Sequence, residues 1–243
     1  RGVSPDLART IIRTNSTAIA AMMMQRGEAD AMICGTYGHY DWHLKHVLDV
    51  IGKAPGVRDV SAISALIVKK GTFFICDTQV TPDPSMEEIV EMTLLGADVV
   101  RRFGMDPKVA LISHSNFGNA DTPSAKKMRA AVATLCDRAP ELEVEGEMHA
   151  DSAVSPVLRQ RVFPNARLNG AANLLVYPNL EAANGAFNLL KAAGDGLAVG
   201  PLLLGAAKPV HIVTPSISAR GLVNMSALAV VDSQSREEQT PLL

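Results

Sequence analysis

The chain has 243 residues, of which 47% are hydrophobic and 20% are charged, and its net charge is −2. This apolar content suffices for the core of one large domain or two small ones, and no apolar run reaches the roughly 18 residues that a membrane span needs. Aromatic residues make up only 4% of the chain and do not alternate with basic ones, which excludes nucleic acid as an expected partner.

The N-terminal stretch predicts two helices separated by a strand. Ser4 can cap a helix that has Pro5 at its first position, and Gly27 can end it. The three methionines at positions 22–24 lie on this helix, where packing in the core is the expected role. The next elements are expected to be a buried strand, a loop and a helix, over Asp30–Cys34, Gly35–Tyr40 and Trp42–Ile51.

A β-hairpin and a capped helix are expected next. Asp59–Lys69 and Thr72–Cys76 have the composition of strands, with a hairpin turn expected around Lys70 and Gly71. Ser85 and Glu88 form a capping-box pattern that opens a helix running to about residue 103.

The rest of the chain alternates strands with helices, which predicts an α/β fold with mostly parallel sheets and helices on both faces. Strands are expected over Val109–Ser113, Glu143–Met148, Asn173–Tyr177 and Val210–Val213. Helices are expected from Thr122 to about Arg138, for a short stretch from Ser155, over Glu181–Ala192, and from about Ser218 to Val231. The polar residues 233–243 are expected to form a loose tail.

Four loops follow the carboxyl ends of predicted strands, which is where α/β sheets bind ligands. They span Gly35–Tyr40, His114–Asp121, Pro178–Asn184 and Thr214–Ser218. The second loop is rich in small hydroxyl and amide side chains, and we expect its backbone N–H groups to be exposed and available to an anion. An ordinary polar turn has the same composition, so both interpretations stay open.

Histidines gather in the segment that contains His39, His43 and His46, with Asp41 nearby. Three histidines and a carboxylate can bind a metal ion, but these residues do not all share one helix face. We therefore predict no metal site and a polar helix that lines a cleft or an interface. Titration of these histidines near neutral pH is a further alternative.

Alternating acidic residues mark the stretch Glu145, Glu147, His149 and Asp151, which we expect on one face of a strand. They can be paired carboxylates for acid–base chemistry or a solvated edge.

The cysteines Cys34, Cys76 and Cys136 are widely spaced on apolar segments and are expected to be buried free thiols. With no signal-peptide pattern at the start of the chain, they predict a cytoplasmic protein.

Several segments resemble the phosphate acetyl/butyryltransferase family, in the same order along nearly the whole chain. Gly27–Met32 resembles the family's Gly-Asp-Ala-Asp-Gly segment, and Glu145–Met148 resembles Asp-Gly-Glu-Leu. Asn169–Leu180 with Asn184 resembles the block Gly-Lys-Ala-Asn-Val-Leu-Ile-Phe-Pro-Asp-Leu-x-x-x-Asn. The family's Ser-x-Ser-Thr-Lys-Gly-Ser loop corresponds to Ser113–Asn119.

The resemblance implies two α/β lobes, as in isocitrate and isopropylmalate dehydrogenases. We expect residues 1–58 and 194–243 in the first lobe and residues 59–193 in an inserted second lobe, with the ligand in the cleft between them. It also implies that about the first quarter of the domain lies upstream of Arg1, a residue that a helix signal follows at once.

Catalytic groups of the family are replaced in this chain. The family's Ser-Arg pair falls at Thr214 and Pro215, and its nearby Asp falls at Gly221. An Arg supplies a cationic fork for a phosphate or an oxyanion, whereas Pro has no side-chain donor. Arg220 is expected on the following helix, where we do not expect it to substitute for the lost Arg.

Three further cationic or polar positions also differ. Asn116 and Phe117 stand where the family loop has Thr and Lys, and Lys45 stands where the family has an Arg. Lys keeps the charge but not the bidentate geometry of Arg.

One subset of the family has the same losses: the acetyltransferase-like domain at the C-terminus of large bacterial NADP-dependent malic enzymes. This chain resembles that domain, including the segment Tyr37–Tyr40. The resemblance implies an acetyl-CoA-binding domain that inhibits conversion of malate to pyruvate and CO₂ and supports a homo-oligomer, a hexamer in the parent protein. NADP and a divalent metal would bind only in an N-terminal part of the parent. Acetyl-CoA contacts are expected at Lys45, Ser113, Ser115, Asn116, Gly118, Asn119, Asn173, Asn179, Asn184 and Thr214.

Three functional hypotheses follow, in order of preference. The first is the regulatory acetyl-CoA-binding domain, which has no catalytic residue of its own. The second is a working phosphate acetyl/butyryltransferase that uses Thr214 or Arg220 instead. The third is an oligomerisation module whose cleft binds nothing.

Overall fold

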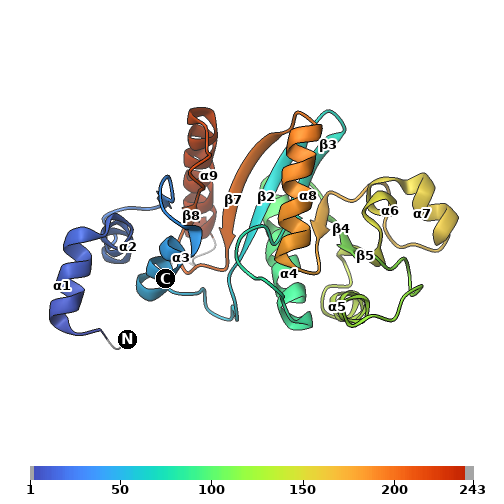
Figure 1. Cartoon of the computed structure of the whole chain (residues 1–243), viewed down its shortest axis with the longest axis horizontal. Coiled ribbons are helices and arrows are strands. Elements are labelled where there is room, and N and C mark those ends of the chain that lie inside the picture. The colour runs from blue at the N-terminus through green and yellow to red at the C-terminus, as the bar shows by residue number, and fades with distance from the viewer. Residues whose placement is uncertain (1–2, 239–243) are drawn as a thin grey trace. The chain divides into compact units, whose positions relative to one another are not determined.

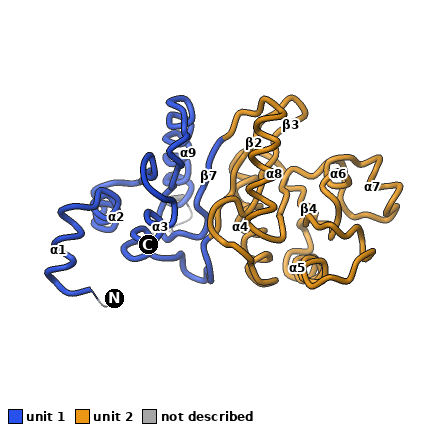
Figure 2. The backbone as a smooth tube through the Cα atoms, viewed as in Figure 1, with its two compact units in different colours: residues 1–60, 199–243 blue, residues 61–198 orange. Residues whose placement is uncertain are grey.

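Helices and strands alternate along the chain and divide between two units in a computed structural model that describes residues 3–238 (Figures 1 and 2). The first unit contains residues 1–60 and 199–243, and the second contains residues 61–198. The strand β7 (Leu197–Leu204) carries the chain from the second unit back into the first.

The first unit is built on two short parallel strands, β1 (Met32–Cys34) and β8 (Val210–Ile212). Met32 of β1 and Val210 and Ile212 of β8 are buried, and Met32 pairs with Val210. The helices described in this unit are α1 (Pro5–Thr14), α2 (Ser16–Arg26), α3 (Tyr40–Val50) and α9 (Ala219–Glu238). Helices α2 and α9 contact β1, and α3 contacts β8.

The single helix predicted from Ser4 to Gly27 is in fact two helices. Ser4 caps α1 and Gly27 ends α2 in the left-handed conformation (φ 72°), as predicted. Between them Asn15 has extended backbone, and its side chain accepts the N–H of Ala18, so it caps a new helix. Of the three methionines at positions 22–24, only the last is buried, so the expected core role is wrong for the other two.

The second unit contains a mostly parallel sheet with the strand order β5-β4-β6-β3-β2. Its strands are β2 (Ser61–Val68), β3 (Gly71–Cys76), β4 (Lys108–Ile112), β5 (Glu143–Met148) and β6 (Leu174–Val176). The predicted hairpin is confirmed, because β2 and β3 pair in antiparallel fashion, although the turn lies at Lys69 and Lys70, one residue earlier than expected. The other pairs, β3 with β6, β4 with β6 and β4 with β5, are parallel.

Helices cover both faces of this sheet, as the sequence predicts. They are α4 (Met86–Arg102), α5 (Pro123–Arg138), α6 (Ala150–Val154), α7 (Pro156–Val162) and α8 (Leu180–Ala193). Ala153 of α6 and Ala183 of α8 pack in one cluster with Leu175 of β6. The adjacent Leu174 points to the opposite face, where Gly96 of α4 approaches it. The capping box of Ser85 and Glu88 at the start of α4 is present.

Three features differ from the sequence-based expectation. Strand β7 was not predicted, because Pro201 falls inside it and proline disfavours a strand interior. The short helix α6 was also missed. Helix α9 extends to Glu238, so the expected loose tail is helical over residues 233–238, and residues 239–243 lie outside the described part. None of the helices in residues 3–238 has both the length and the apolar character that crossing a membrane requires.

Candidate functional site

A pocket of about 870 Å³ lies in the second unit, beyond the carboxyl ends of β3, β4 and β6. The N-terminal parts of α5 and α8, with their caps, contribute Thr122, Pro123, Ser124, Lys127, Asn179, Leu180 and Glu181, and neighbouring loops contribute Pro82, Asp83 and His114. This edge of a parallel sheet is where α/β proteins bind ligands. Both helix N-termini place partial positive charge at the pocket, which favours an anionic ligand.

Lys127 connects the loops that form this pocket. Its Nζ donates hydrogen bonds to the carboxylate of Asp83 at 2.7 Å and to the carbonyl oxygens of Pro84 and Pro178, at 2.7 and 3.0 Å. The three donors of the ammonium group are thus used to hold the segments after β3 and β6 together. Sequence reasoning missed Lys127 because it is one of several lysines on a helix, and its acceptors lie far away in the chain.

The serine loop, Ser113–Asp121, follows β4 and is wrapped around the buried carboxylate of Glu147. Glu147 accepts hydrogen bonds from the hydroxyl of Ser115 at 2.6 Å and from the N–H of Gly118 at 2.9 Å. Arg129 donates to both oxygens of the same carboxylate, at 3.1 and 3.2 Å. A negative side chain of the protein itself therefore occupies the centre of the loop.

The expectation that the backbone N–H groups of this loop are free is wrong for most of them. The N–H of Ser115 donates to Ser113 Oγ, that of Asn116 to Asn119 Oδ1, and that of Ala120 to Ser115 Oγ. The N–H groups of Phe117 and Gly118 donate to the carbonyl oxygen and the carboxylate of Glu147. An anion can bind these groups only if the loop rearranges.

The acidic stretch 145–151 does not lie on one face of a strand. Strand β5 ends at Met148, His149 precedes α6, and Asp151 lies within that helix. Glu145 accepts the N–H of Arg167 at 2.6 Å, whereas Glu147 faces the serine loop. These carboxylates are therefore bound to backbone and side-chain donors, and the paired arrangement expected for acid–base chemistry is absent among these residues.

The pKa of Glu147 reflects the hydrogen bonds that its carboxylate accepts in the serine loop. Burial opposes its ionisation, but the hydrogen bonds from Arg129, Ser115 and Gly118 outweigh burial and hold the pKa below its usual value. A carboxyl group whose pKa is lower in the folded state contributes stability above its unfolded pKa, and this stability is lost as the pH falls through the folded pKa.

We predict that Glu147→Gln lowers the free energy of unfolding by about 2 kcal/mol at pH 7, because charge-assisted hydrogen bonds are lost. The difference between the variant and the wild type is expected to shrink once the pH falls below the ordinary glutamate pKa of about 4.3, and to shrink further as it falls through the lower pKa of folded Glu147. Urea denaturation across this pH range measures it, with Glu141→Gln, an exposed carboxyl of the same region, as the control. A difference that is independent of pH would contradict the assigned role.

The expected contact residues of the second unit fall at different places. Asn179 lines the pocket and caps α8, where its side chain accepts the N–H of Ala182 at 2.9 Å. Asn184 donates to the carbonyl oxygen of Thr78 at 3.1 Å. Asn173 precedes β6 and bonds Lys108 and Asp106, at the opposite end of the strands. The structure thus separates Asn173 from the others.

In the first unit, the loops after β1 and β8 lie side by side. A Cβ atom on Gly35 (φ 99°) would stand 2.1 Å from the carbonyl oxygen of Val213, so only glycine fits this approach. The Val213 N–H donates to the carbonyl oxygen of Cys34 at 2.8 Å, and Thr214 Oγ1 lies 3.0 Å from Ser216 Oγ. Thr214 is therefore placed at the carboxyl edge of these strands, as the sequence predicts.

The positions of the lost catalytic groups are now structurally defined. Pro215 is exposed directly after Thr214. Gly221 is buried in α9, and a Cβ atom there would lie 2.9 Å from Cγ1 of Ile217. The Ile217 side chain thus fills the space that an aspartate at Gly221 needs. Lys45 is exposed and forms an ion pair with Asp49 at 2.7 Å.

The histidines of α3 have structural partners. His43 is buried, with Nδ1 2.7 Å from the hydroxyl of Thr17 and Nε2 donating to the carbonyl oxygen of Tyr37 at 2.5 Å. His46 accepts from Asn15 Nδ2 at 2.8 Å, which links α3 to the cap of α2. Within residues 3–238, no group of three histidine, cysteine, aspartate or glutamate side chains is arranged to hold a metal ion.

The cysteines are free thiols, but only Cys76 is fully buried, so the expected burial is wrong for Cys34 and Cys136. Partial burial still raises the pKa of Cys34 to about 12, and a hydrogen bond with Thr17 lowers it by a smaller amount. A thiol with this pKa is protonated at neutral pH, which makes Cys34 a poor nucleophile.

Comparisons with known proteins give a consistent result. The family model "Phosphate acetyl/butaryl transferase" matches residues 1–230. The chain is 56% identical over 232 residues to the NAD-dependent malic enzyme of Rhizobium meliloti and 50% identical over 237 residues to the NADP-dependent malic enzyme of Escherichia coli. These matches cover 96% and 97% of this chain but only 30% and 31% of the malic enzymes.

A solved structure supports the same relationship. The EutD phosphotransacetylase from Staphylococcus aureus has a TM-score of 0.82 and 28% sequence identity, over 96% of this chain and 71% of that protein. The resemblance predicted from the sequence, to the acetyltransferase-like part of malic enzymes, is therefore confirmed, as is the α/β fold class. The chain belongs to the phosphate acetyl/butaryl transferase family.

Proposed function

We propose that this chain is the regulatory domain of a malic enzyme, and that it binds acetyl-CoA without transferring the acetyl group. The observation that carries the proposal is the chemistry at Pro215 and Gly221. Pro215 offers no donor to a developing oxyanion, and Ile217 occupies the space beside Gly221. A site that keeps its fold but loses stabilisation specific to the transition state can bind without turning over.

The parent activity in this proposal is oxidative decarboxylation of malate to pyruvate and CO₂. Malic enzymes named for NAD and for NADP are both among the similar proteins, so the proposal does not depend on the NADP preference predicted from the sequence. Several further statements stay predictions. They are inhibition by acetyl-CoA, assembly into a homo-oligomer up to a hexamer, a cytoplasmic location, and binding of NADP and a metal elsewhere in the parent protein.

The pocket at the starts of α5 and α8 is the proposed seat for the phosphates of acetyl-CoA. Two helix N-termini and His114 face it, while Asp83 is already paired with Lys127. Asn179 belongs to this pocket, and Ser113, Ser115, Asn116, Gly118 and Asn119 would join it only through rearrangement of the serine loop. Lys45 and Thr214 of the first unit stay predicted contacts.

Ser124→Asp tests this seat. A carboxylate in the first turn of α5 stabilises the helix but repels an anionic ligand, so we expect acetyl-CoA affinity to fall roughly fivefold to tenfold without loss of stability. Ser124→Asn, which has the same size and no charge, is the control and should bind as the wild type does. Equal affinities of the two variants would place the phosphates elsewhere.

The function itself is tested by titrating acetyl-CoA into the chain in phosphate buffer, by calorimetry and with an assay for free CoA thiol. Transfer would move the acetyl group from sulfur to a phosphate oxygen and release the thiol. We expect a saturating isotherm and no thiol. Thiol release in proportion to time would overturn the proposal in favour of a working transferase.

A specific observation favours the oligomerisation module as the second candidate. The serine loop is closed on Glu147, so its backbone offers few free donors to a ligand. Absence of binding by calorimetry and by a second method would support this candidate.

A further inference from the structure

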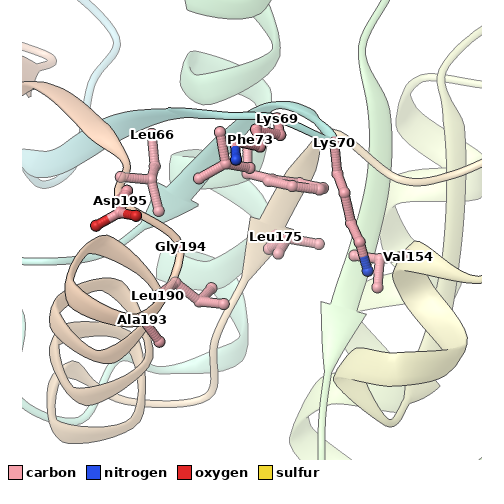
Figure 3. A pocket seen from close by; sticks show the side chains of 11 residues that line it. Leu66, Lys69, Lys70, Phe73, Val154, Leu175, Leu190, Ala193, Gly194 and Asp195 are labelled. Atoms are coloured by element: carbon pink, nitrogen blue, oxygen red, sulfur yellow. The ribbon is translucent and has the colours of Figure 1, made fainter.

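A second pocket of about 470 Å³ lies in the second unit, near the hairpin turn where β3 begins (Figure 3). Residues of β2, β3, β6, α6 and the end of α8 line it: Leu66, Val68, Lys69, Lys70, Phe73, Val154, Leu175, Leu190, Ala193, Gly194 and Asp195. The proposed acetyl-CoA pocket lies beyond the other end of β3, and the two pockets have no lining residue in common. Its volume is within the range of small-molecule sites.

The walls of this pocket are apolar and remain open to solvent. Leu66 and Leu175 form part of the core beneath it, and Phe73 packs against the same core cluster. Leu190 on α8 and Val154 on α6 are 41% and 39% exposed. Covering these side chains with an apolar ligand would remove them from water, which is the main source of affinity for such a ligand.

The α8–β7 connection closes one side of the pocket, and its sequence is suited to close packing. A Cβ atom on Gly196 would lie 2.5 Å from Cδ1 of Leu66, and one on Gly194 would lie 3.2 Å from Cγ1 of Val68. Asp195 between them has a positive φ of 47°. The two glycines thus let the connection approach β2, so the wall is held by close backbone packing.

Charge is distributed unevenly at the pocket mouth. Lys69 and Lys70 are exposed and have no ion pair or hydrogen bond with any other described residue. Figure 3 shows the Lys70 side chain reaching along the side of the pocket opposite to Asp195. An apolar cavity whose lining includes two exposed ammonium groups without a partner among the described residues suits a ligand with an apolar chain and a single anionic end.

We infer that this pocket binds an unbranched monocarboxylate, with its alkyl chain between α8 and the sheet and its carboxylate at Lys69 and Lys70. This site is independent of the proposed acetyl-CoA site, because no residue is shared. Affinity is expected to rise about fourfold with each added methylene until the pocket is filled, as for transfer of alkyl chains from water.

The test is calorimetric titration of the chain with butanoate, hexanoate and octanoate, with 1-octanol as the uncharged probe. Leu190→Trp and Ala193→Phe are expected to abolish binding by filling the pocket. Leu189→Trp, on the same helix but 69% exposed and outside the pocket, is the matched control and should bind normally. The double variant Lys69→Gln/Lys70→Gln should weaken octanoate at least fivefold and leave 1-octanol unchanged, whereas Arg138→Gln should change neither.

Three results would overturn the inference. They are absence of saturable octanoate binding, octanoate affinity that survives both pocket-filling variants, and equal binding of octanoate and 1-octanol with no effect of the lysine variants. The last result would leave a pocket for uncharged apolar ligands, which is a different class. Unchanged circular dichroism spectra of the variants ensure that lost binding does not reflect unfolding.

Discussion

Replacing Arg159 with methionine is expected to lower the free energy of unfolding by about 4 kcal/mol, and the thermal midpoint by roughly 10 °C. Arg159 lies on α7 with its side chain only 2% exposed. Its guanidinium donates to the carbonyl oxygens of Ser152 at 3.0 Å, Ala153 at 3.2 Å and Leu168 at 3.0 Å, and also to that of Gly170.

These acceptors explain the size of the effect. Ser152 and Ala153 belong to α6, whose last carbonyl groups have no partner within the helix. Leu168 and Gly170 lie in the segment that leads into β6. Burial lowers the pKa of Arg159, and the negative charge of Glu145 partly offsets this. Methionine keeps the apolar packing but removes these four hydrogen bonds. The carbonyl oxygen of Ala153 still accepts the N–H of Ala172, and Gly170 is exposed, so the loss falls mainly on the buried carbonyl oxygens of Ser152 and Leu168. A buried acceptor that loses its donor costs about 1–3 kcal/mol when water cannot replace it.

Arg161→Met is the matched control, since Arg161 lies two residues later on the same short helix and is exposed. We expect its effect to stay within about 0.5 kcal/mol of zero. Arg159→Lys should be intermediate, because a single ammonium group cannot reach four separated carbonyl groups. Equal effects of Arg159→Met and Arg161→Met on urea denaturation would show that the buried hydrogen bonds do not support α6.

The sequence could not distinguish Arg159 from Arg161. Its four acceptors are backbone atoms of a helix end and a loop, so no residue type marks them. The same limit applies to Lys127, which bonds the carbonyl oxygens of Pro84 and Pro178. Side-chain bonds to distant backbone groups carry no sequence signature. The loops His114–Asp121 and Pro178–Asn184 were expected to bind a ligand, but of the individual contact residues predicted only Asn179 lines the pocket.

Elements with local chemical signals were predicted well. The box of Ser85 and Glu88, the Thr122-Pro123 start of α5 and the hairpin turn at Lys69 and Lys70 each depend on residues within a few positions of each other. Asn15 was missed because it caps α2 from within a continuous helical pattern. Strand β7 contains Pro201, so local sequence does not identify it, and only strand pairing in the folded protein does.

The composition of the serine loop led to the wrong prediction that its backbone N–H groups are free to bind an anion. Small polar residues fit both an open anion cradle and a loop that satisfies itself, and the deciding partner, Glu147, lies on another strand. An anionic ligand could replace the carboxylate of Glu147 in this loop only if Arg129 and Ser115, which now bond that carboxylate, formed hydrogen bonds with other groups. The proposed binding of acetyl-CoA would therefore carry a reorganisation cost if it used the donors of this loop.

Gly35→Ala is the second change with a large expected effect, at least about 3 kcal/mol of lost stability. The new Cβ atom would overlap the carbonyl oxygen of Val213, since the two would be 2.1 Å apart, and φ at this position is 99°. Relief requires β1 and β8 to move apart, which breaks the bond from the Val213 N–H to Cys34. These strands pair over only three residues each, so little else holds their register.

Gly56→Ala separates the cost of steric overlap from the cost of backbone strain. Gly56 also has a positive φ, of 80°, but no atom lies within 4 Å of the added Cβ. It should cost about 1–2 kcal/mol from backbone strain alone. Hydrogen exchange at the Val213 amide distinguishes the variants further, since protection should fall in Gly35→Ala and persist in Gly56→Ala. Equal losses of stability with unchanged protection would mean that steric contact at Val213 is relieved without separating the strands, and Thr214 would then keep its place at the carboxyl edge of β8.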